Sequence, residues 1–376
     1  MTETSTLNAQ DDFQLSNEER AILHDVGYDD ETQRSATSIL IDRQMRVAQS
    51  SHDDVVMMPL AEALRTFDFA QDLMFGQVLA EGNEDLLEIS AHMDDPLGHF
   101  TWVRPGAKVA LPVQSFTVLE MPQGRQFTHD ITLIDEGADV EMISGATVPE
   151  FVHAGRHVCL SETYMRAGAQ SRSVSIEHWG GNMEVRSYSY SQMEKGAHSS
   201  STAISLGTVR DHQAFSHINL GEDAHSVSQS IVLALEGTTK RIDDEITLSA
   251  RGARSESVTR MVAAGGTIIN NAVLIGDAAE TTGFLGCDGL KLTESGEIIA
   301  VPALRARAEA AQLSHEASVG MVSSEKLGYL MASGLDEDTA RGLIVQGFLS
   351  LNSAYIPKTV QDRVTEMILQ AKSGGM

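Results

Sequence analysis

The sequence is poor in cysteine and in long apolar runs, and each shortage excludes a class of protein. Its two cysteines, Cys159 and Cys287, are too few for a disulfide framework and are typical of a reducing compartment. No apolar run reaches the roughly 18 residues of a membrane-spanning helix. The N-terminus MTETSTLNAQDDF has neither the basic flank nor the apolar core of a signal peptide. We therefore expect a cytoplasmic protein.

Basic residues are also scarce, with 27 Lys and Arg against 53 Asp and Glu, a formal charge of −26. Such a surface repels phosphate backbones and anionic lipid, which argues against nucleic-acid or membrane partners. The sequence also lacks a phosphate-binding G-x-x-x-x-G-K-[ST] loop, a dinucleotide fingerprint, a G-x-S-x-G elbow and zinc-type cysteine pairs. If the protein depends on ATP, another chain must hydrolyse it.

Residues 1–92 are predicted to form a mainly helical N-terminal region. Ser16 and Glu19 have the spacing of a capping box, which predicts a helix through NEERAILHDVG. A second helical stretch follows Pro59 and ends at Gly82, as the usual positions of these two residues indicate. The spacing of its apolar residues is only loosely helical.

From residue 93 to residue 321 the chain is mainly β, with short Val-, Ile-, Ser- and Thr-rich segments separated by glycine corners. These corners recur every 24–31 residues, at Gly137, Gly168, Gly196, Gly221, Gly252 and Gly276. Such a period, with a corner and short strands in each unit, predicts a β-solenoid in which each coil packs on the next. A β-sandwich is the alternative, but its turns come about every 8–12 residues.

Residues 322–376 are predicted to form a C-terminal helical domain. Ser323 can cap a helix that ends at Gly334, Asp336 can cap a second, and Pro357 opens a third. The second helix carries an apolar stripe with helical spacing that includes Leu343, Ile344, Gly347 and Phe348. This stripe either packs on the solenoid or binds a partner.

Cys287 is the more reactive candidate of the two thiols, because Gly286 and Gly289 leave little bulk around it. A thiolate is a soft ligand for iron, and a histidine and a carboxylate, such as His315 and Glu316, can complete the metal's shell. Adjacent strand residues point to opposite faces, so His315 and Glu316 can serve one site only at a strand end or where subunits meet. The alternative is that none of the three binds a metal: Cys287 would be a buried apolar thiol, His315 a core histidine and Glu316 a surface carboxylate.

The other candidates are weaker. Cys159 alternates with Val158 and Leu160 like a residue within a strand, which indicates a structural role. The histidines of DHQAFSHINLGEDAH (His212, His217 and His225) have spacings that match no standard zinc pattern.

The segments GCDGLKL, QLSHEASVG and SSEKLGYLMASGLDEDTARGLIVQGF, with IEHWGG and the glycine corners upstream, resemble the SufB/SufD family of SUF iron–sulfur assembly scaffolds. Glu316 follows Cys287 by 29 positions, and this spacing and the order of the motifs make the likeness specific. The resemblance covers roughly residues 95–370 and is most like the minimal archaeal form. It implies a right-handed parallel β-helix with flanking helices, even where the alanines of ALRARAEAAQLSHEAS favour a helix.

The resemblance also implies a homodimer, joined through the solenoid edges, and a SufC-type ABC ATPase bound to the C-terminal helices. A transient iron–sulfur cluster would form at the dimer interface on Cys287, His315 and Glu316, from a sulfur donor, and pass to apoproteins. The family's second, sulfur-accepting cysteine is replaced by Ala146, so sulfide is expected to reach Cys287 directly.

Two other functions remain open at this point. The chain can be a SufD-like structural partner that has no cluster site of its own. The other possibility agrees less well with the sequence: a carboxylate-rich β-helix can be a carbohydrate-cleaving enzyme. That function would require an acidic pair in a groove.

Overall fold

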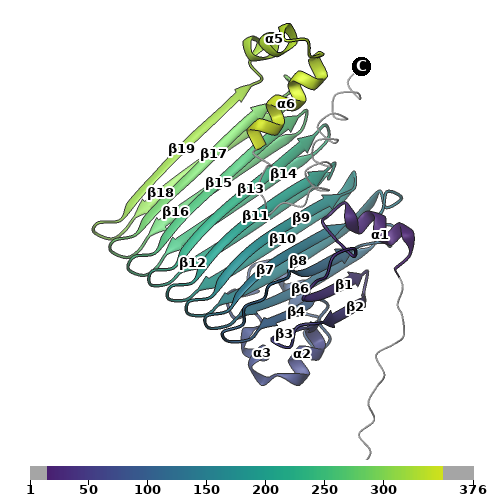
Figure 1. Cartoon of the computed structure of the whole chain (residues 1–376), viewed down its shortest axis with the longest axis vertical. Coiled ribbons are helices and arrows are strands. Elements are labelled where there is room, and N and C mark those ends of the chain that lie inside the picture. The colour runs from purple at the N-terminus through teal and green to yellow at the C-terminus, as the bar shows by residue number, and fades with distance from the viewer. Residues whose placement is uncertain (1–14, 350–376) are drawn as a thin grey trace, which may run out of the picture.

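The computed structural model describes residues 15–349 and shows a β-solenoid with short helices at its ends (Figure 1). Two sheets face each other, and each coil contributes one strand to each sheet, which gives about eight coils between residues 100 and 321. From β4 onward, neighbouring strands within a sheet run parallel. The predicted solenoid is therefore confirmed.

The ten-stranded sheet is called sheet A and the nine-stranded sheet is called sheet B. The strands of sheet A are β1 (Ala36–Ile41), β2 (Gln44–Ser50), β5 (Val113–Val118), β7 (Asp139–Thr147), β9 (Gln170–Trp179), β11 (His198–Gly207), β13 (His225–Leu235), β15 (Arg254–Ala264), β17 (Thr282–Lys291) and β19 (Gln312–Met321). The strands of sheet B are β3 (Val55–Pro59), β4 (His99–Val103), β6 (Arg125–Ile134), β8 (Ala154–Met165), β10 (Asn182–Met193), β12 (Asp211–Leu220), β14 (Thr239–Leu248), β16 (Thr267–Gly276) and β18 (Glu297–Ala306).

Left-handed backbone at the corners lets the chain pass from one sheet to the other. Gly168 and Gly196 have φ values of 68° and 65°, a region that glycine adopts without steric cost. The amide of Gly168 donates to the carbonyl of Lys195 in the next coil, so the corner also joins two coils. At the corner after Gly221, Asp223 takes the positive φ instead, at 53°.

The N-terminal region contains more strand than the sequence led us to expect. Four helices are present in its described part, namely α1 (Asn17–His24), α2 (Leu60–Thr66), α3 (Asp68–Leu73) and α4 (Glu84–Ser90). Strands β1 and β2 form an antiparallel hairpin, and β1 continues sheet A by pairing in parallel with β5. The predicted capping box of Ser16 and Glu19 is present in α1. The expected long helix after Pro59 is instead broken at Phe67, which is extended and lies against other aromatic rings.

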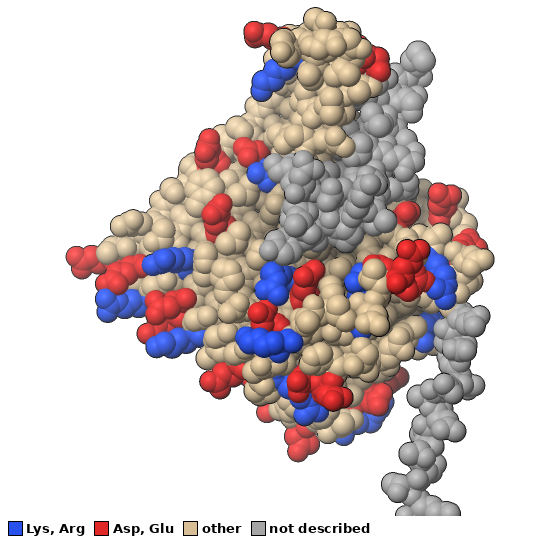
Figure 2. Space-filling model, viewed as in Figure 1, with Lys and Arg blue, Asp and Glu red and all other residues tan. Residues whose placement is uncertain are grey.

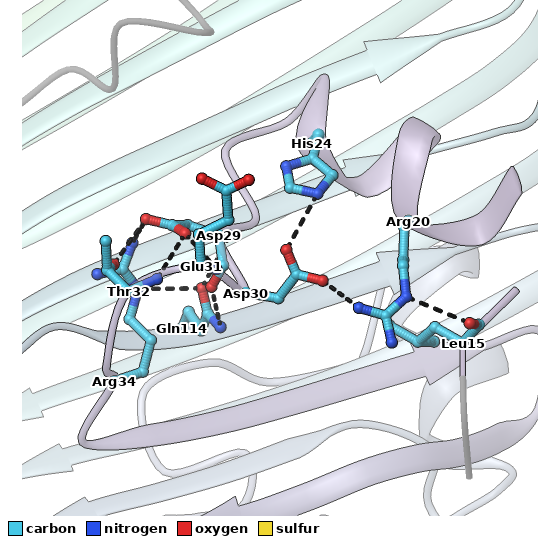
Figure 3. A network of polar contacts seen from close by, with 9 residues as sticks. All are labelled: Leu15, Arg20, His24, Asp29, Asp30, Glu31, Thr32, Arg34 and Gln114. Atoms are coloured by element: carbon cyan, nitrogen blue, oxygen red, sulfur yellow. Dashed lines mark hydrogen bonds and ion pairs between the residues drawn. The ribbon is translucent and has the colours of Figure 1, made fainter. Parts of the chain in front are cut away.

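Polar contacts fix the segment after α1 to the solenoid (Figure 3). Asp30 accepts a hydrogen bond from Arg20 and lies 3.3 Å from His24 Nε2, which joins the segment to the helix. Asp29 pairs with Arg34 at 2.7 Å, and the Gln114 side chain on β5 donates to the backbone carbonyl of Asp29. This end of the solenoid is thus covered by chain on its outer side.

The apolar core has separate parts inside and outside the solenoid. One cluster fills the space between the sheets and includes Val140, Leu248, Leu274 and Leu285. A second lies on the outer face of sheet A, where it includes residues of α1 and α6. A third lies on the outer face of sheet B under α2 and α3. The middle of the interior is more polar, because Ser173, Ser201, Ser228 and Ser257 follow one another in register along sheet A.

Acidic and basic side chains intermingle along the coil corners (Figure 2). Several pairs join neighbouring coils, among them Arg166–Glu194, Lys195–Glu222, Arg251–Glu280 and Arg307–Asp277. Exposed pairs of this kind each contribute little to stability, typically about 0–1 kcal/mol. They do balance part of the local negative charge.

Two helices follow the last coil, α5 (Ser324–Ala332) and α6 (Glu337–Leu349). The predicted caps are confirmed: Ser323 accepts from the Lys326 amide and Asp336 accepts from the Thr339 amide. The third helix, expected from Pro357, lies outside the described residues. Within residues 15–349 no helix has the length and apolarity needed to cross a bilayer.

Candidate functional site

Cys287 lies on the inner face of β17, one coil below the C-terminal end of the solenoid. Its side chain is 1% exposed and belongs to the core cluster between the sheets. The thiol donates a hydrogen bond to Asn270 Oδ1 across the interior, with 3.4 Å between sulfur and oxygen. Burial raises the pKa of the Cys287 thiol to about 11, and the charges of Asp244 and Asp288 add to the effect. At neutral pH the group is therefore a protonated thiol.

His315 and Glu316 both lie on β19, the last strand of sheet A, but they point to opposite faces. His315 pairs in register with Leu285, which points inward, so His315 and Cys287 share the inner face. Strand spacing places the Cα atoms of His315 and Cys287 about 8 Å apart. Glu316 pairs with Gly286 and therefore projects from the outer face of sheet A.

A single subunit thus brings two of the three predicted site residues to one face and leaves the third on the other. Both His315 and Glu316 are exposed, whereas Cys287 is buried. No cluster of three metal-binding side chains forms anywhere in residues 15–349. The predicted combination of Cys287, His315 and Glu316 therefore needs a second subunit or a movement of the last coil.

Among residues 15–349, nothing pairs with the C-terminal end of the solenoid, which is open in this sense. Strands β18 and β19 are each the last strand of their sheet, and every residue of β19 except Leu313 is exposed. Apolar side chains of this coil lie in solvent, with Val301 at 51% and Met321 at 54% exposure. An uncovered strand edge with apolar side chains is a surface suited to pairing with another chain.

Small residues separate the thiol from this open end. Ala317 pairs with Cys287, and Ala300 pairs with Asn270, so both members of the Cys287–Asn270 contact are covered by alanines. Methyl groups are the smallest side chains that can close the end of a coil. The thiol is therefore only one strand from solvent in the direction of the solenoid axis.

The sequence did not point to Asn270 or Asp244 as neighbours of this thiol. Asn270 is fully buried on the inner face of β16. Asp244, on the inner face of β14, accepts a hydrogen bond from Ser216, and burial raises the pKa of its carboxyl to about 6. The alternation of TIINNAVLIG does predict that one of its two asparagines faces inward, and this local pattern is the signal for Asn270.

The weaker candidates do not form a site. His212 is buried between the sheets, 3.1 Å from Glu177, whereas His217 lies on the opposite face of the same strand. His225 lies on sheet A against His198. Cys159 is on the inner face of β8, where burial raises the pKa of its thiol to about 12. It is separated from Asn270 by four strand spacings, about 19 Å.

Helix α6 packs against the outer face of sheet A and divides the predicted partner-binding residues. Ile344 and Phe348 pack with the buried Val345 and Leu349 on the solenoid. Leu343 is 47% exposed and points away from this contact, and Gly347 is also exposed. The apolar stripe is therefore only partly available to a partner.

A groove of about 430 Å³ lies on the outer face of sheet A, the face that also carries Glu316. Its lining includes His225, Arg254, Glu256, Phe284 and Gln312. Glu256 is the only carboxylate among the described residues that line the groove, so these residues do not supply the acid pair of a glycoside-cleaving enzyme.

Comparison with known families identifies the class of protein. Residues 117–348 match the family model described as "SUF system FeS cluster assembly, SufBD core domain". This segment contains the solenoid from the end of β5 onward, the open end and most of α6. The class is therefore that of the iron–sulfur cluster assembly proteins of the SUF system.

Individual proteins with similar sequences support the same family. An iron–sulfur cluster assembly SufBD family protein of Archaeoglobus fulgidus is 32% identical over 351 residues, 93% of this chain and 94% of the relative. A SufBD family protein of Pyrococcus horikoshii is 26% identical over 85% of this chain and 72% of its own length. SufB of Bacillus subtilis is 26% identical over 69% of this chain and 57% of its own length. The chain belongs to the SufBD family and has a role in SUF iron–sulfur cluster assembly.

Proposed function

We propose that this protein is the scaffold on which an iron–sulfur cluster is built, at an interface between two copies of the chain. The observation that carries this proposal is the position of Cys287, one strand below an open solenoid end and on the same face as His315. Thiolate and imidazole are both iron ligands. The cluster is cargo here, held until it passes to an apoprotein.

Pairing of two copies through their last coils supplies what a single subunit lacks. The uncovered edges of β18 and β19 favour association, because pairing satisfies their backbone groups and covers Val301 and Met321. A two-fold axis through this seam would bring the residues beside it close to their counterparts in the second copy. Two thiols and two imidazoles then lie on the inner side of one seam, and the two Glu316 carboxylates lie on its outer side.

The thiol must become accessible for assembly to begin, and we assign this step to a partner. A SufC-type ABC ATPase bound at α5 and α6 would supply the energy, in keeping with the lack of a phosphate-binding motif in this chain. Helix α6 packs on sheet A and contacts β15, next to the strand that carries Cys287. Movement of the helix can therefore shift the last coils and expose the sulfur. This chain would catalyse no reaction itself.

Carboxylate and imidazole ligands suit a cluster that is to be handed on, since they hold iron less firmly than a full set of thiolates. The position of the family's second cysteine is occupied by Ala146 on β7. We therefore propose that sulfide from a donor protein reaches Cys287 from the open end of the solenoid. Assembly would take place in the cytoplasm.

Coexpression with the ATPase, followed by anaerobic purification, tests the proposal. We expect a complex with two scaffold chains and two ATPase chains that binds iron and acid-labile sulfide after reconstitution. Cys287→Ala should abolish the visible absorption of the cluster, whereas the matched variant Cys159→Ala should keep it. Unchanged absorption in Cys287→Ala would overturn the assignment.

A second function, that of a SufD-like structural partner, is favoured by one observation. Cys287 is buried and Glu316 projects from the other face, so a single chain presents no ready ligand set. In that case the chain would copurify with a second SufBD homologue and would bind neither iron nor sulfide by itself.

A further inference from the structure

Asn270 is the polar side chain that meets the Cys287 thiol inside the solenoid, and half of its amide group is left without a partner. Its Oδ1 accepts the hydrogen bond from Cys287 Sγ at 3.4 Å. Its Nδ2 is buried and has no hydrogen-bond partner among the described residues. Leaving a buried N–H donor without an acceptor is costly, so such atoms are rare in folded proteins.

The surroundings of Asn270 offer it no other acceptor side chain along its own row of sheet B. Its neighbours in register are Ile242 on β14 and Ala300 on β18. Along β16 the next inward side chains are Ile268 and Ala272. The Cys287 thiol is the side chain that makes a hydrogen bond with Asn270 among the described residues, so we take the sulfur as the reason for an asparagine at this position.

The chemistry of the carboxamide suits two states of that sulfur. Its oxygen and nitrogen ends have nearly the same shape, so a half turn about the Cβ–Cγ bond exchanges them within the same space. With the oxygen toward Cys287, the amide accepts from a thiol S–H. With the nitrogen toward Cys287, it donates an N–H to a sulfur that no longer carries a proton.

We propose that Asn270 is a positioning residue for the cluster sulfur, donating its amide N–H to Cys287 Sγ when that sulfur binds iron. This inference rests on the proposed scaffold function. When ferrous iron binds, the S–H bond breaks, the sulfur lone pair forms the S–Fe bond and the proton leaves to the solvent. No electron changes hands. The half turn of Asn270 then satisfies both the buried N–H and the negative sulfur, as hydrogen bonds to ligand sulfur do in iron–sulfur sites.

Asn271 provides a matched control. It has the same side chain and lies on the same strand, but it points to the outer face, where its amide donates to Asp243. A change at Asn271 disturbs β16 without touching the thiol.

The first experiment uses the full-length protein without iron, in a Cys159→Ser background that leaves Cys287 as the only thiol. We expect Asn270→Leu, which has no side-chain N–H donor, to slow alkylation of Cys287 by iodoacetamide about three- to tenfold. The pH at which the alkylation rate rises should also become higher. Asn270→Asp should slow it further, because a carboxylate opposes a neighbouring thiolate. Asn270→Ser retains a donor hydroxyl and should partly restore the rate. Asn271→Leu should leave the rate and the profile unchanged.

The second experiment measures ferrous iron binding by the sulfur-to-iron charge-transfer absorption. A shifted band with weaker binding in Asn270→Leu supports the proposal, whereas a band and an alkylation profile equal to those of Asn271→Leu overturn it. If Asn270→Leu does not fold, the alkylation profiles of Asn270→Ser and Asn270→Asp are compared instead. Equal profiles for these two variants would overturn the proposal. Wild-type protein that binds no iron, but shows the expected order of alkylation rates, would contradict the scaffold function and leave the Asn270–sulfur contact supported.

Discussion

Ala317 pairs in register with Cys287 across the last two strands of sheet A, so a methyl group lies between the buried thiol and the open end of the solenoid. This arrangement keeps the thiol out of solvent while leaving only a small barrier above it. A larger side chain at Ala317 should therefore close the route from the open end.

We expect Ala317→Leu to slow iron and sulfide incorporation at Cys287 at least tenfold, because the added bulk covers the thiol. Ser318→Leu is the matched control, since it adds the same side chain to the opposite face of β19. Iron and acid-labile sulfide would be measured after anaerobic reconstitution, with light scattering to confirm that both variants retain the oligomeric state of the wild type. Equal incorporation in the two variants would contradict a route through the solenoid end.

Leu343 is the large exposed side chain of the apolar stripe on α6, and we expect Leu343→Asp to weaken binding of the proposed ATPase partner at least tenfold. A charge placed within an apolar contact costs more than the roughly 1.4 kcal/mol that a tenfold change requires. Leu79→Asp is the control, because Leu79 is 80% exposed and lies in the N-terminal region, far along the chain from α6. Titration calorimetry with the purified ATPase measures the affinity of each variant. Comparable losses in both variants would argue against α6 as the docking surface.

The pair formed by His129 and Glu162 anchors the N-terminal helices to sheet B. Both side chains are fully buried, their atoms are 2.8 Å apart, and Glu162 also accepts from the backbone amides of Phe75 and Gln77. Glu162→Ala should lower the free energy of unfolding by about 3 kcal/mol, since it leaves buried donors without acceptors.

Glu162→Gln is the conservative control, because its amide oxygen can still accept one of these hydrogen bonds. Urea unfolding, followed by circular dichroism, gives the two free energies. If the alanine variant proves as stable as the glutamine variant, the polar contacts do not hold this region in place.

Asp244 should give the folded protein a specific dependence on pH. Its carboxyl has a pKa near 6 in the folded protein and near 3.8 when unfolded, so the folded state binds more protons between these values. This group's contribution to stability is therefore present below about pH 4 and is lost as pH rises toward 6, by about 1–3 kcal/mol.

Asp244→Asn should remove this dependence. At pH 7 the variant is expected to be more stable than the wild type, and the difference should vanish near pH 4. The free energies of unfolding of the wild type and the variant, measured at pH 4, 5, 6 and 7, give this difference. A difference that stays constant with pH would show that the carboxyl is not perturbed.

Much of the solenoid could be predicted because its corners leave a local signal. Gly137, Gly168 and Gly196 all have positive φ, and their regular spacing showed the coil length before any contact was known. Helix caps such as Ser16 and Ser323 were equally local and equally visible.

The orientation of the site was harder to predict because it depends on pairing between distant strands. Alternation showed that His315 and Glu316 point to opposite faces, but the exposed segment SHEAS has no apolar pattern that says which faces inward. That assignment required the register of β19 against Leu285 and Gly286. The contact between Cys287 and Asn270 crosses from one sheet to the other, so no local pattern reports it.

The regular pairing of strands also limits how such a chain can change in length. Asp211 pairs with Thr239, 28 positions further on, and the pairing between β12 and β14 has no shift. One residue inserted within a strand would turn every following side chain of that strand inside out. A duplicated or deleted unit of a full turn leaves both faces intact, so related solenoids can differ in height by whole turns while their two ends keep their shape.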